Sequence, residues 1–273
     1  MNLSAIVNNI RRKKSFLCVG LDPDITLMPK SLLELADPIF EFNKAIIDAT
    51  HDLCVAYKPN LAFYEKLGPS GWLSLEKTIK YISDEHLIIA DAKRSDIFNS
   101  AKMYADTFFD YLNCHGVTIS PYMGFDSVDP FLKKDKWAIL LIATSNPSAS
   151  SIQNISTNNN IPLYLELVKQ VNSWSNEHSI MFVVGATRLS EMSEIRKISP
   201  NHFFLVPGVG AQGGSLKDVF QHGSNMNCGL LVNISRSIIY AGSDVNFKDK
   251  MRATTLTIQC EMESLLKDGK ILI

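Results

Sequence analysis

Short apolar runs alternate with longer amphipathic stretches along the whole chain. Eight runs of mostly apolar residues, each followed by polar residues, are typical of buried strands; they lie at 16–21, 53–57, 87–90, 115–119, 137–143, 180–184, 203–206 and 230–234. Apolar residues at helical spacing fill most of the intervals between these runs, at 39–50, 71–83, 97–112, 126–134, 162–176, 189–198 and 247–266. The pattern therefore predicts eight strands that alternate with helices.

This alternation is typical of parallel βα units. Eight such units in about 250 residues predict an α/β fold of the closed (β/α)8 type, the TIM barrel. The alternative is an open, doubly wound sheet. No linker, repeat or change in composition divides the chain, so we expect residues 1–273 to form a single domain. A polar segment at 144–160 is the only low-complexity stretch, and we expect it to be either disordered or a lid.

The third apolar run leads directly into charges of both signs. Successive side chains of a strand point to opposite faces, so Asp91 and Lys93 share one face and Ala92 lies on the other. Charges at the end of a buried strand have a solvation cost unless they are paired or used in chemistry. The alternative is a structural ion pair, with Asp96 as an ordinary cap of the helix that follows.

Five charged residues share a predicted position at the carboxyl ends of strands, namely Asp22, Lys58, Asp91, Lys93 and Arg236. Active sites of (β/α)8 barrels lie at these ends. Each residue alone could be a rim charge whose side chain extends to solvent. Five charges at one rim instead favour a functional site.

A glycine-rich loop follows the seventh apolar run. Residues 208–213 match the dinucleotide pattern GxGxxG, but another glycine and a polar stretch follow, and Asn233 stands near the place where an acid is needed. We therefore expect the loop amides and the Gln212 side chain to bind an anion. Phosphate sites in these barrels often use the loops after strands seven and eight, where Arg236 supplies a fork of donors.

Composition excludes several classes of protein. The chain is 46% hydrophobic with a formal net charge of −1, which argues against a protein that coats nucleic acid but allows a local anion site. Five scattered cysteines without a CxxC motif favour reduced thiols in the cytoplasm. No apolar stretch nears the length of a membrane span. Basic residues 11–14 follow the apolar residues of the first segment, the reverse of a secretory signal, and indicate a surface helix with cations at its carboxyl end.

Five motifs together resemble one family, the orotidine 5′-phosphate decarboxylases, in their longer bacterial branch (type 2). They are Asp91-Ala92-Lys93-Arg94-Ser95-Asp96-Ile97, Lys58-Pro59-Asn60, Thr144-Ser145-Asn146-Pro147, residues 206–213 and Ser235-Arg236. The resemblance covers nearly the whole chain. Three positions depart from the family pattern: Ser95 and Ser148 where glycine is usual, and Ser100 where threonine is usual.

The resemblance implies a decarboxylation of orotidine 5′-phosphate to uridine 5′-phosphate, the last step of de novo pyrimidine nucleotide synthesis, without metal or cofactor. It implies that Lys93 donates the proton, that Asp91 lies beside the departing carboxylate, and that Lys58 and Asp96 complete an alternating charge array. It also implies a homodimer in which Asp96, Ile97 and Ser100 reach into the neighbouring site. The substrate contacts it implies are Asp22 and Lys58 to the ribose, Ser145 to the pyrimidine, and Pro207, Gln212, Ser235 and Arg236 to the phosphate and its loop.

Two rival hypotheses remain. A metal-dependent relative that acts on sugar phosphates shares the Asp-x-Lys-x-x-Asp strand, but it would be expected to end its second strand in a carboxylate ligand, where Lys58 stands here. A catalytically silent phosphate-binding barrel has no need for Lys93 at an apolar strand end. Binding without product would support that second rival.

Overall fold

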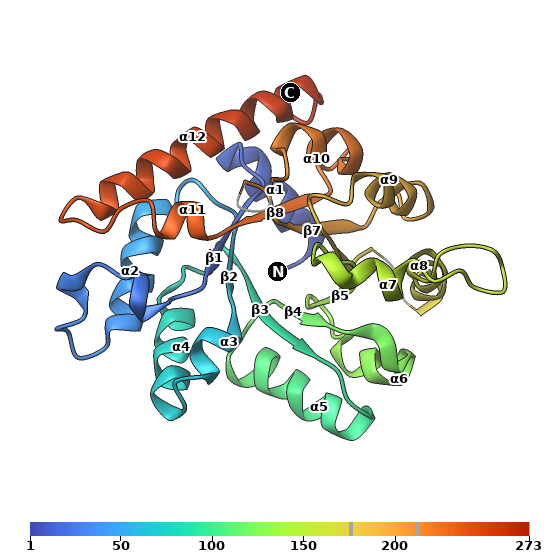
Figure 1. Cartoon of the computed structure of the whole chain (residues 1–273), viewed down its shortest axis with the longest axis horizontal. Helices are drawn as coiled ribbons and strands as arrows, with labels where there is room; N and C mark the ends of the chain where they lie inside the picture. Colours follow the sequence, from blue (N-terminus) through green and yellow to red (C-terminus); the bar gives the residue numbers. More distant parts are fainter. Residues whose placement is uncertain (175–176, 211–212, 273) are drawn as a thin grey trace.

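Eight parallel strands close into a barrel in the order β1 to β8, and β8 pairs with β1 (Figure 1). The computed structural model describes residues 1–174, 177–210 and 213–272. The strands are β1 Leu17–Leu21, β2 Ala56–Pro59, β3 Leu87–Arg94, β4 Gly116–Ile119, β5 Trp137–Ala143, β6 Ile180–Val184, β7 Phe203–Pro207 and β8 Leu230–Ile234. The predicted (β/α)8 barrel is confirmed, and the open-sheet alternative is wrong.

Helices surround the barrel and cover one of its ends (Figure 1). They are α1 Leu3–Lys13, α2 Pro38–Thr50, α3 Leu61–Glu65, α4 Pro69–Tyr81, α5 Phe98–Asp106, α6 Phe125–Val128, α7 Ser150–Gln153, α8 Leu163–Trp174, α9 Leu189–Ile198, α10 Leu216–Gly223, α11 Arg236–Ile239 and α12 Phe247–Asp268. Short helical turns join them: η1 Ile25–Leu27, η2 Lys30–Leu32, η4 Pro121–Met123, η5 Asp129–Phe131, η6 Pro147–Ala149 and the π-helical η3 Thr107–Tyr111.

The strands are mostly apolar, with polar residues toward their carboxyl ends, because the helices cover the outside of the barrel and side chains fill the inside. All five residues of β1, β6 and β8 are buried. Four of the five cysteines are buried free thiols, and Cys260 is exposed and free. The interpretation of the cysteines as reduced thiols agrees with this structure.

Several elements differ from the sequence prediction. The second strand begins at Ala56 rather than at 53, because the Leu53 and Cys54 amides still bond to Thr50 of α2. Helices α3 and α10 were not predicted; α3 has only five residues, too few to show a period. The predicted helix at 97–112 divides into α5 and the π-helical η3.

The polar segment at 144–160 contains two short helical elements, η6 and α7. An antiparallel bridge pairs Ser156 with Pro162, so the segment folds back on itself before α8. The Arg188 guanidinium donates a hydrogen bond to Asn154 Oδ1 at 2.9 Å, which ties the segment to the start of α9. The segment between β5 and α8 therefore contacts both the residues just before α8 and the start of α9.

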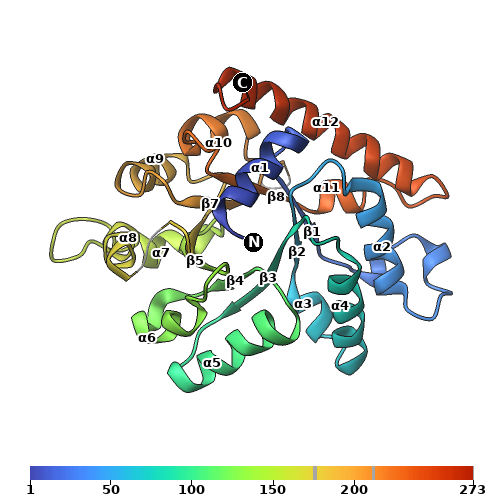
Figure 2. The same cartoon turned by 180° about the vertical axis from the view of Figure 1, so that it is seen from behind.

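Helix α1 covers the amino-terminal end of the barrel, as the view from behind shows (Figure 2). Its residues Ile6, Val7 and Ile10 are buried, as its apolar spacing requires. The Trp137 indole, at the start of β5, donates to the Met1 carbonyl at 2.9 Å. The expectation of a simple surface helix is wrong in one respect, because Lys13 of the basic run is also buried.

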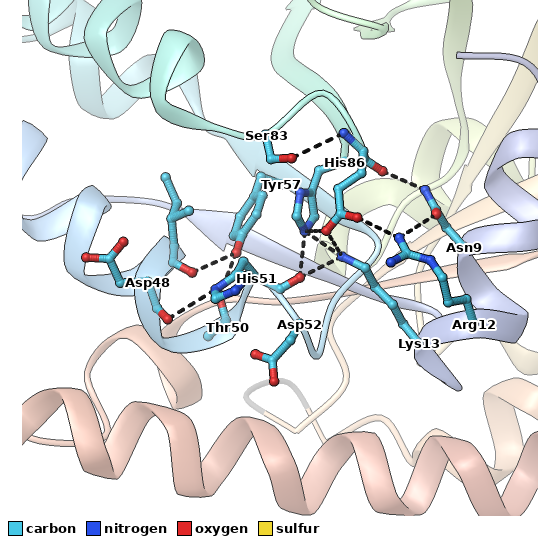
Figure 3. Close-up of polar contacts among 12 residues, drawn as sticks. Asn9, Arg12, Lys13, Asp48, Thr50, His51, Asp52, Tyr57, Ser83 and His86 are labelled. Atoms are coloured by element: carbon cyan, nitrogen blue, oxygen red, sulfur yellow. Dashed lines mark hydrogen bonds and ion pairs between the residues drawn. The ribbon is translucent and has the colours of Figure 1, made fainter.

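Lys13 is the centre of a polar cluster between α1 and the starts of β2 and β3 (Figure 3). Its ammonium donates to the His51 carbonyl at 2.6 Å and lies 2.7 Å from His86 Nε2 and 3.0 Å from Glu85 Oε1. His86 Nε2 also lies 2.7 Å from the His51 carbonyl oxygen. Arg12 pairs with the other oxygen of Glu85 at 2.7 Å. Burial, with the Lys13 charge, lowers the pKa of His86 to about 4, so His86 is neutral at neutral pH.

Candidate active site

A cavity of about 710 Å³ opens at the carboxyl ends of the strands. One side is charged and is lined by Asp22, Lys58, Asp91 and Lys93, from the ends of the first three strands. The facing side is apolar and includes Leu141 of β5, Val183 of β6 and Leu205 of β7. The cavity can therefore hold a ligand with one polar, charge-bearing edge and one less polar face.

Asp91 is the common partner of the charged side. Its Oδ2 lies 2.7 Å from the Lys58 ammonium, and its Oδ1 lies 2.6 Å from that of Lys93. The Thr118 hydroxyl donates to Oδ1 at 3.0 Å. Burial alone would raise the pKa of Asp91, but Lys58 and Lys93 outweigh it and hold this pKa well below its ordinary value. Asp91 is therefore a carboxylate at neutral pH.

Lys58 is only 4% exposed, so the alternative of a rim charge that extends to solvent is wrong for this residue. Burial would lower the pKa of its ammonium, but the charges of Asp91 and Asp22 outweigh burial and raise the pKa above its ordinary value. Lys58 thus remains a fixed cation that is enclosed by the barrel wall.

Lys93 differs from Lys58 in both backbone and exposure. Its φ is 48°, in the left-handed region that side-chain-bearing residues seldom adopt. The register between β3 and β4 shifts between Ala90 and Arg94, so Lys93 lies in a bulge. Its side chain is 53% exposed and reaches into the cavity while it pairs with Asp91. Strand alternation predicted the meeting of Asp91 and Lys93 but not the bulge.

Arg94 closes the end of β3 from outside the cavity. Its guanidinium bonds to Glu65 of α3 and donates to the Ala92 carbonyl at 2.8 Å. It also lies over the Tyr104 ring of α5, 5.3 Å from the ring centroid. This basic residue of the motif therefore anchors the strand end to two helices.

Asp22 is held by the loop after β8. The Ser235 hydroxyl donates to Asp22 Oδ2 at 2.6 Å. A Cβ on Gly20 would lie 2.7 Å from the Ser235 Cβ, so glycine is needed for this approach. The other oxygen, Asp22 Oδ1, is buried and has no hydrogen-bond partner among the described residues. The same is true of Oδ1 of Asn233, a cavity-lining residue that sequence reasoning did not select.

Ser145 lines the cavity at the end of β5. Gln153 of α7 fixes the preceding residue through two reciprocal bonds, because its Oε1 accepts from the Thr144 amide at 3.0 Å and its amide donates to the Thr144 hydroxyl at 2.9 Å. A Cβ on Gly185 would lie 2.8 Å from the Ser145 Cβ. Sequence reasoning missed Gln153 because it lies in the polar segment without a recognisable pattern.

The glycine-rich loop after β7 is built on left-handed glycines, with φ of 101° at Gly208 and 73° at Gly210. Pro207 lines the cavity, whereas Gln212 lies outside the described residues. Arg236 begins α11 and is exposed. Ser235 and Arg236 follow β8 but do not line the cavity themselves.

Asp96, Ile97 and Ser100 also lie outside the cavity of their own subunit. Asp96 Oδ1 accepts from the adjacent Ile97 amide at 2.8 Å, so its bond is to the next residue rather than to a later amide of the helix. Ile97 is 60% exposed. Of the predicted site residues, the structure brings together Asp22, Lys58, Asp91, Lys93, Ser145 and Pro207 at one cavity.

Within residues 1–174, 177–210 and 213–272, His, Cys, Asp and Glu residues form no group of three or more that could hold a metal ion. Across the same residues, no helix combines the length and apolar character needed to cross a membrane.

A closed parallel barrel with lysines and aspartates at its carboxyl mouth defines a (β/α)8-barrel enzyme. Residues 15–248 match the model of the orotidine 5′-phosphate decarboxylase / HUMPS family, and the chain belongs to this family.

Individual relatives agree with the family assignment. The chain is 52% identical to an orotidine 5′-phosphate decarboxylase of Bacteroides fragilis, over 98% of this chain and 99% of the relative. It is 51% identical to the enzyme of the same name from Phocaeicola vulgatus, over 97% and 99%. The solved structure of Leishmania donovani OMP decarboxylase has a TM-score of 0.85 and 34% identity, and the match covers 97% of this chain and 99% of that one.

Proposed function

We propose that this protein is a carboxy-lyase that converts orotidine 5′-phosphate to uridine 5′-phosphate, the last step of de novo pyrimidine nucleotide synthesis. The observation that carries the proposal is the Lys58–Asp91–Lys93 array at the barrel mouth. The names and high identity of full-length relatives support the same reaction. Residues 1–273 form one barrel domain in this proposal, and the enzyme acts in the cytoplasm.

The proposed reaction needs a cation at the reacting carbon. When the bond from the ring carbon to the carboxylate breaks, carbon dioxide leaves and the electron pair stays on the ring. The Lys93 ammonium, which reaches into the cavity, stabilises that charge and then delivers a proton to the carbon. Because its side chain is half exposed, solvent can restore the proton to Lys93 afterwards.

Asp91 lies beside the carboxylate of the substrate in this arrangement. Two unit charges about 4 Å apart interact by roughly 4 kcal/mol at an effective dielectric near 20. This repulsion is small against the roughly 8–23 kcal/mol by which enzymes commonly lower barriers. Stabilisation of the developing charge by Lys93 therefore contributes more to the rate enhancement than ground-state stress from Asp91 does.

Unpartnered acceptors support the ribose contacts. Asp22 Oδ1 and Asn233 Oδ1 are buried and receive no hydrogen bond from any residue that the structure describes, and ligand hydroxyls would satisfy both. Lys58 contributes to the same ribose contacts, and Ser145 contacts the pyrimidine edge. Pro207, Gln212, Ser235 and Arg236 form the phosphate loop region. Binding energy from the phosphate, which is remote from the reacting carbon, would drive closure and exclude water.

The proposed enzyme is a homodimer with shared active sites. The partner subunit's Asp96 completes the charge array, and the partner's Ile97 and Ser100 close the cavity. The location of these residues off their own subunit's cavity supports this arrangement. Exposed apolar side chains on the same segment, including Ile97, Phe98 and Met103, provide a surface for the second copy.

Supplying orotidine 5′-phosphate in the presence of a chelator, and following the loss of its ultraviolet absorbance, tests the proposal. We expect full turnover with the chelator, since the proposed reaction uses no metal or cofactor. No turnover at all would refute the proposed reaction. Turnover that chelation abolishes and Mg²⁺ restores would instead support the metal-dependent relative.

A further inference from the structure

Thr118 occupies the gap in the pairing between β3 and β4. Ala90 pairs with Val117 and Arg94 pairs with Ile119, so three residues of β3 face one residue of β4. Those three residues include Asp91 and Lys93. The side chain of Thr118 is 1% exposed and also lines the cavity. One neutral side chain therefore stands where regular backbone pairing is interrupted.

The Thr118 hydroxyl joins the two charged residues through opposite roles. Its oxygen accepts from the Lys93 amide at 3.0 Å, and the hydroxyl lies 3.0 Å from Asp91 Oδ1. A carboxylate cannot donate, so the single hydroxyl proton points to Asp91. The orientation of this hydroxyl is thus fixed by its partners.

Lys93 needs such support. A lysine with φ of 48° is in a conformation that persists only where the surroundings hold it. The same hydroxyl that satisfies the Lys93 amide also fixes the carboxylate that the Lys93 ammonium pairs with at 2.6 Å. The Thr118 hydroxyl on β4 therefore contacts the Lys93 backbone directly and the Lys93 ammonium indirectly, through Asp91.

We propose that Thr118 is a positioning residue that sets the orientation of Lys93 and Asp91 relative to each other in the decarboxylation. The inference rests on the proposed function. It goes further because it assigns a role to a neutral residue that donates nothing to the substrate in this scheme. The competing role is purely structural: a hydroxyl that only satisfies the amide of a bulge.

Three variants separate these roles. Thr118→Val keeps the shape and removes the hydroxyl, and Thr118→Ser keeps the hydroxyl. Thr255→Val removes another fully buried hydroxyl, which donates to the Met251 carbonyl at 2.7 Å within α12. For each variant, kcat and KM for orotidine 5′-phosphate, the Kd for uridine 5′-phosphate and the melting temperature are measured.

We expect Thr118→Val to lower kcat about 10- to 100-fold, the range of a lost hydrogen bond to a charged group, with the product Kd changed by less than about threefold. Thr118→Ser restores kcat to within about fivefold of wild type. Thr255→Val leaves kcat unchanged even where it lowers the melting temperature. If Thr118 had only a structural role, Thr118→Val would lower the melting temperature without lowering kcat selectively relative to the product Kd.

Each contrary result identifies what has failed. A wild-type enzyme without decarboxylase activity overturns the proposed function. An active wild type whose folded Thr118→Val variant keeps kcat within about twofold overturns the role of Thr118 alone. A folded Thr118→Ser as defective as Thr118→Val also overturns it, because packing rather than the hydroxyl would then matter. If Thr118→Val does not fold, Thr118→Ala is measured against the same kcat limit.

Discussion

Lys58 and Lys93 bind opposite oxygens of one carboxylate, Asp91, and both line the cavity, yet only Lys93 is widely exposed to solvent. The Lys58 side chain is 5% exposed and that of Lys93 is 53% exposed. The buried ion pair with Lys58 holds the Asp91 carboxylate in place. Lys58 is enclosed and fixed, whereas the exposed ammonium of Lys93 has room to move toward a ligand, so the geometry favours different tasks for two chemically identical side chains.

Replacing Lys93 with alanine should abolish turnover and leave product binding largely intact. The variant removes the cation and proton source, whereas the ribose and phosphate contacts of our proposal lie on other loops. Turnover by ultraviolet absorbance and Kd for uridine 5′-phosphate by calorimetry measure the two effects. Lys80→Ala, at an exposed pair on α4, is the matched control and keeps full activity. Substantial turnover by the Lys93→Ala enzyme would refute the role of Lys93.

A mixture of two inactive variants should recover activity. In a hybrid dimer of Lys93→Ala and Asp96→Ala subunits, one of the two sites holds an intact Lys93 and the partner's intact Asp96. Random exchange between subunits would therefore restore about a quarter of wild-type activity. Activity is measured after mixing, and subunit exchange is established separately by mass spectrometry of labelled chains. No recovery despite exchange would count against a shared site.

The barrel was predictable because strands buried on both faces leave continuous apolar runs, as β5 and β6 do. The pairing of Asp91 with Lys93 was predictable from strand alternation. Thr118 and Asn233 were not, because neutral side chains give no charge signal. The one signal that could find them is a polar residue inside an otherwise apolar run. The left-handed backbone of Lys93 depends on the register of β3 with β4, which is a tertiary property.

The basic run at 11–14 shows the same limit. Its four residues are alike in the sequence, but Lys13 is enclosed while Lys14 forms an exposed pair with Glu263. Which cation is buried depends on where α1 meets the starts of β2 and β3 (Figure 3). Charge patterning alone could not separate the two.

Lys13→Ala should therefore destabilise the fold more than Lys14→Ala. The first variant removes the donor to the His51 carbonyl from a buried cluster that includes His86, at a cost of roughly 1–3 kcal/mol. The second removes an exposed pair, which contributes about 0–1 kcal/mol. Urea unfolding of the two neighbouring variants measures the difference. Equal losses of unfolding free energy would contradict a structural role of the cluster around Lys13.

Stability should fall as the pH drops from about 6.5 to about 4, in part through His86. Burial and the Lys13 charge lower the pKa of His86 from 6.5 to about 4, so the unfolded chain binds a proton in this window and the folded chain does not. The contribution of neutral His86 is complete above pH 6.5 and is lost as the pH falls toward 4. Burial lowers the pKa values of His115 and His202 to about 4 as well, so the three residues act in the same direction. Melting temperatures of the wild type and of His86→Gln across this pH range measure how much His86 contributes to the loss of stability. Glutamine has both an amide donor and a carbonyl acceptor but does not titrate, so the variant should show a shallower fall, and an unchanged slope would contradict the assignment.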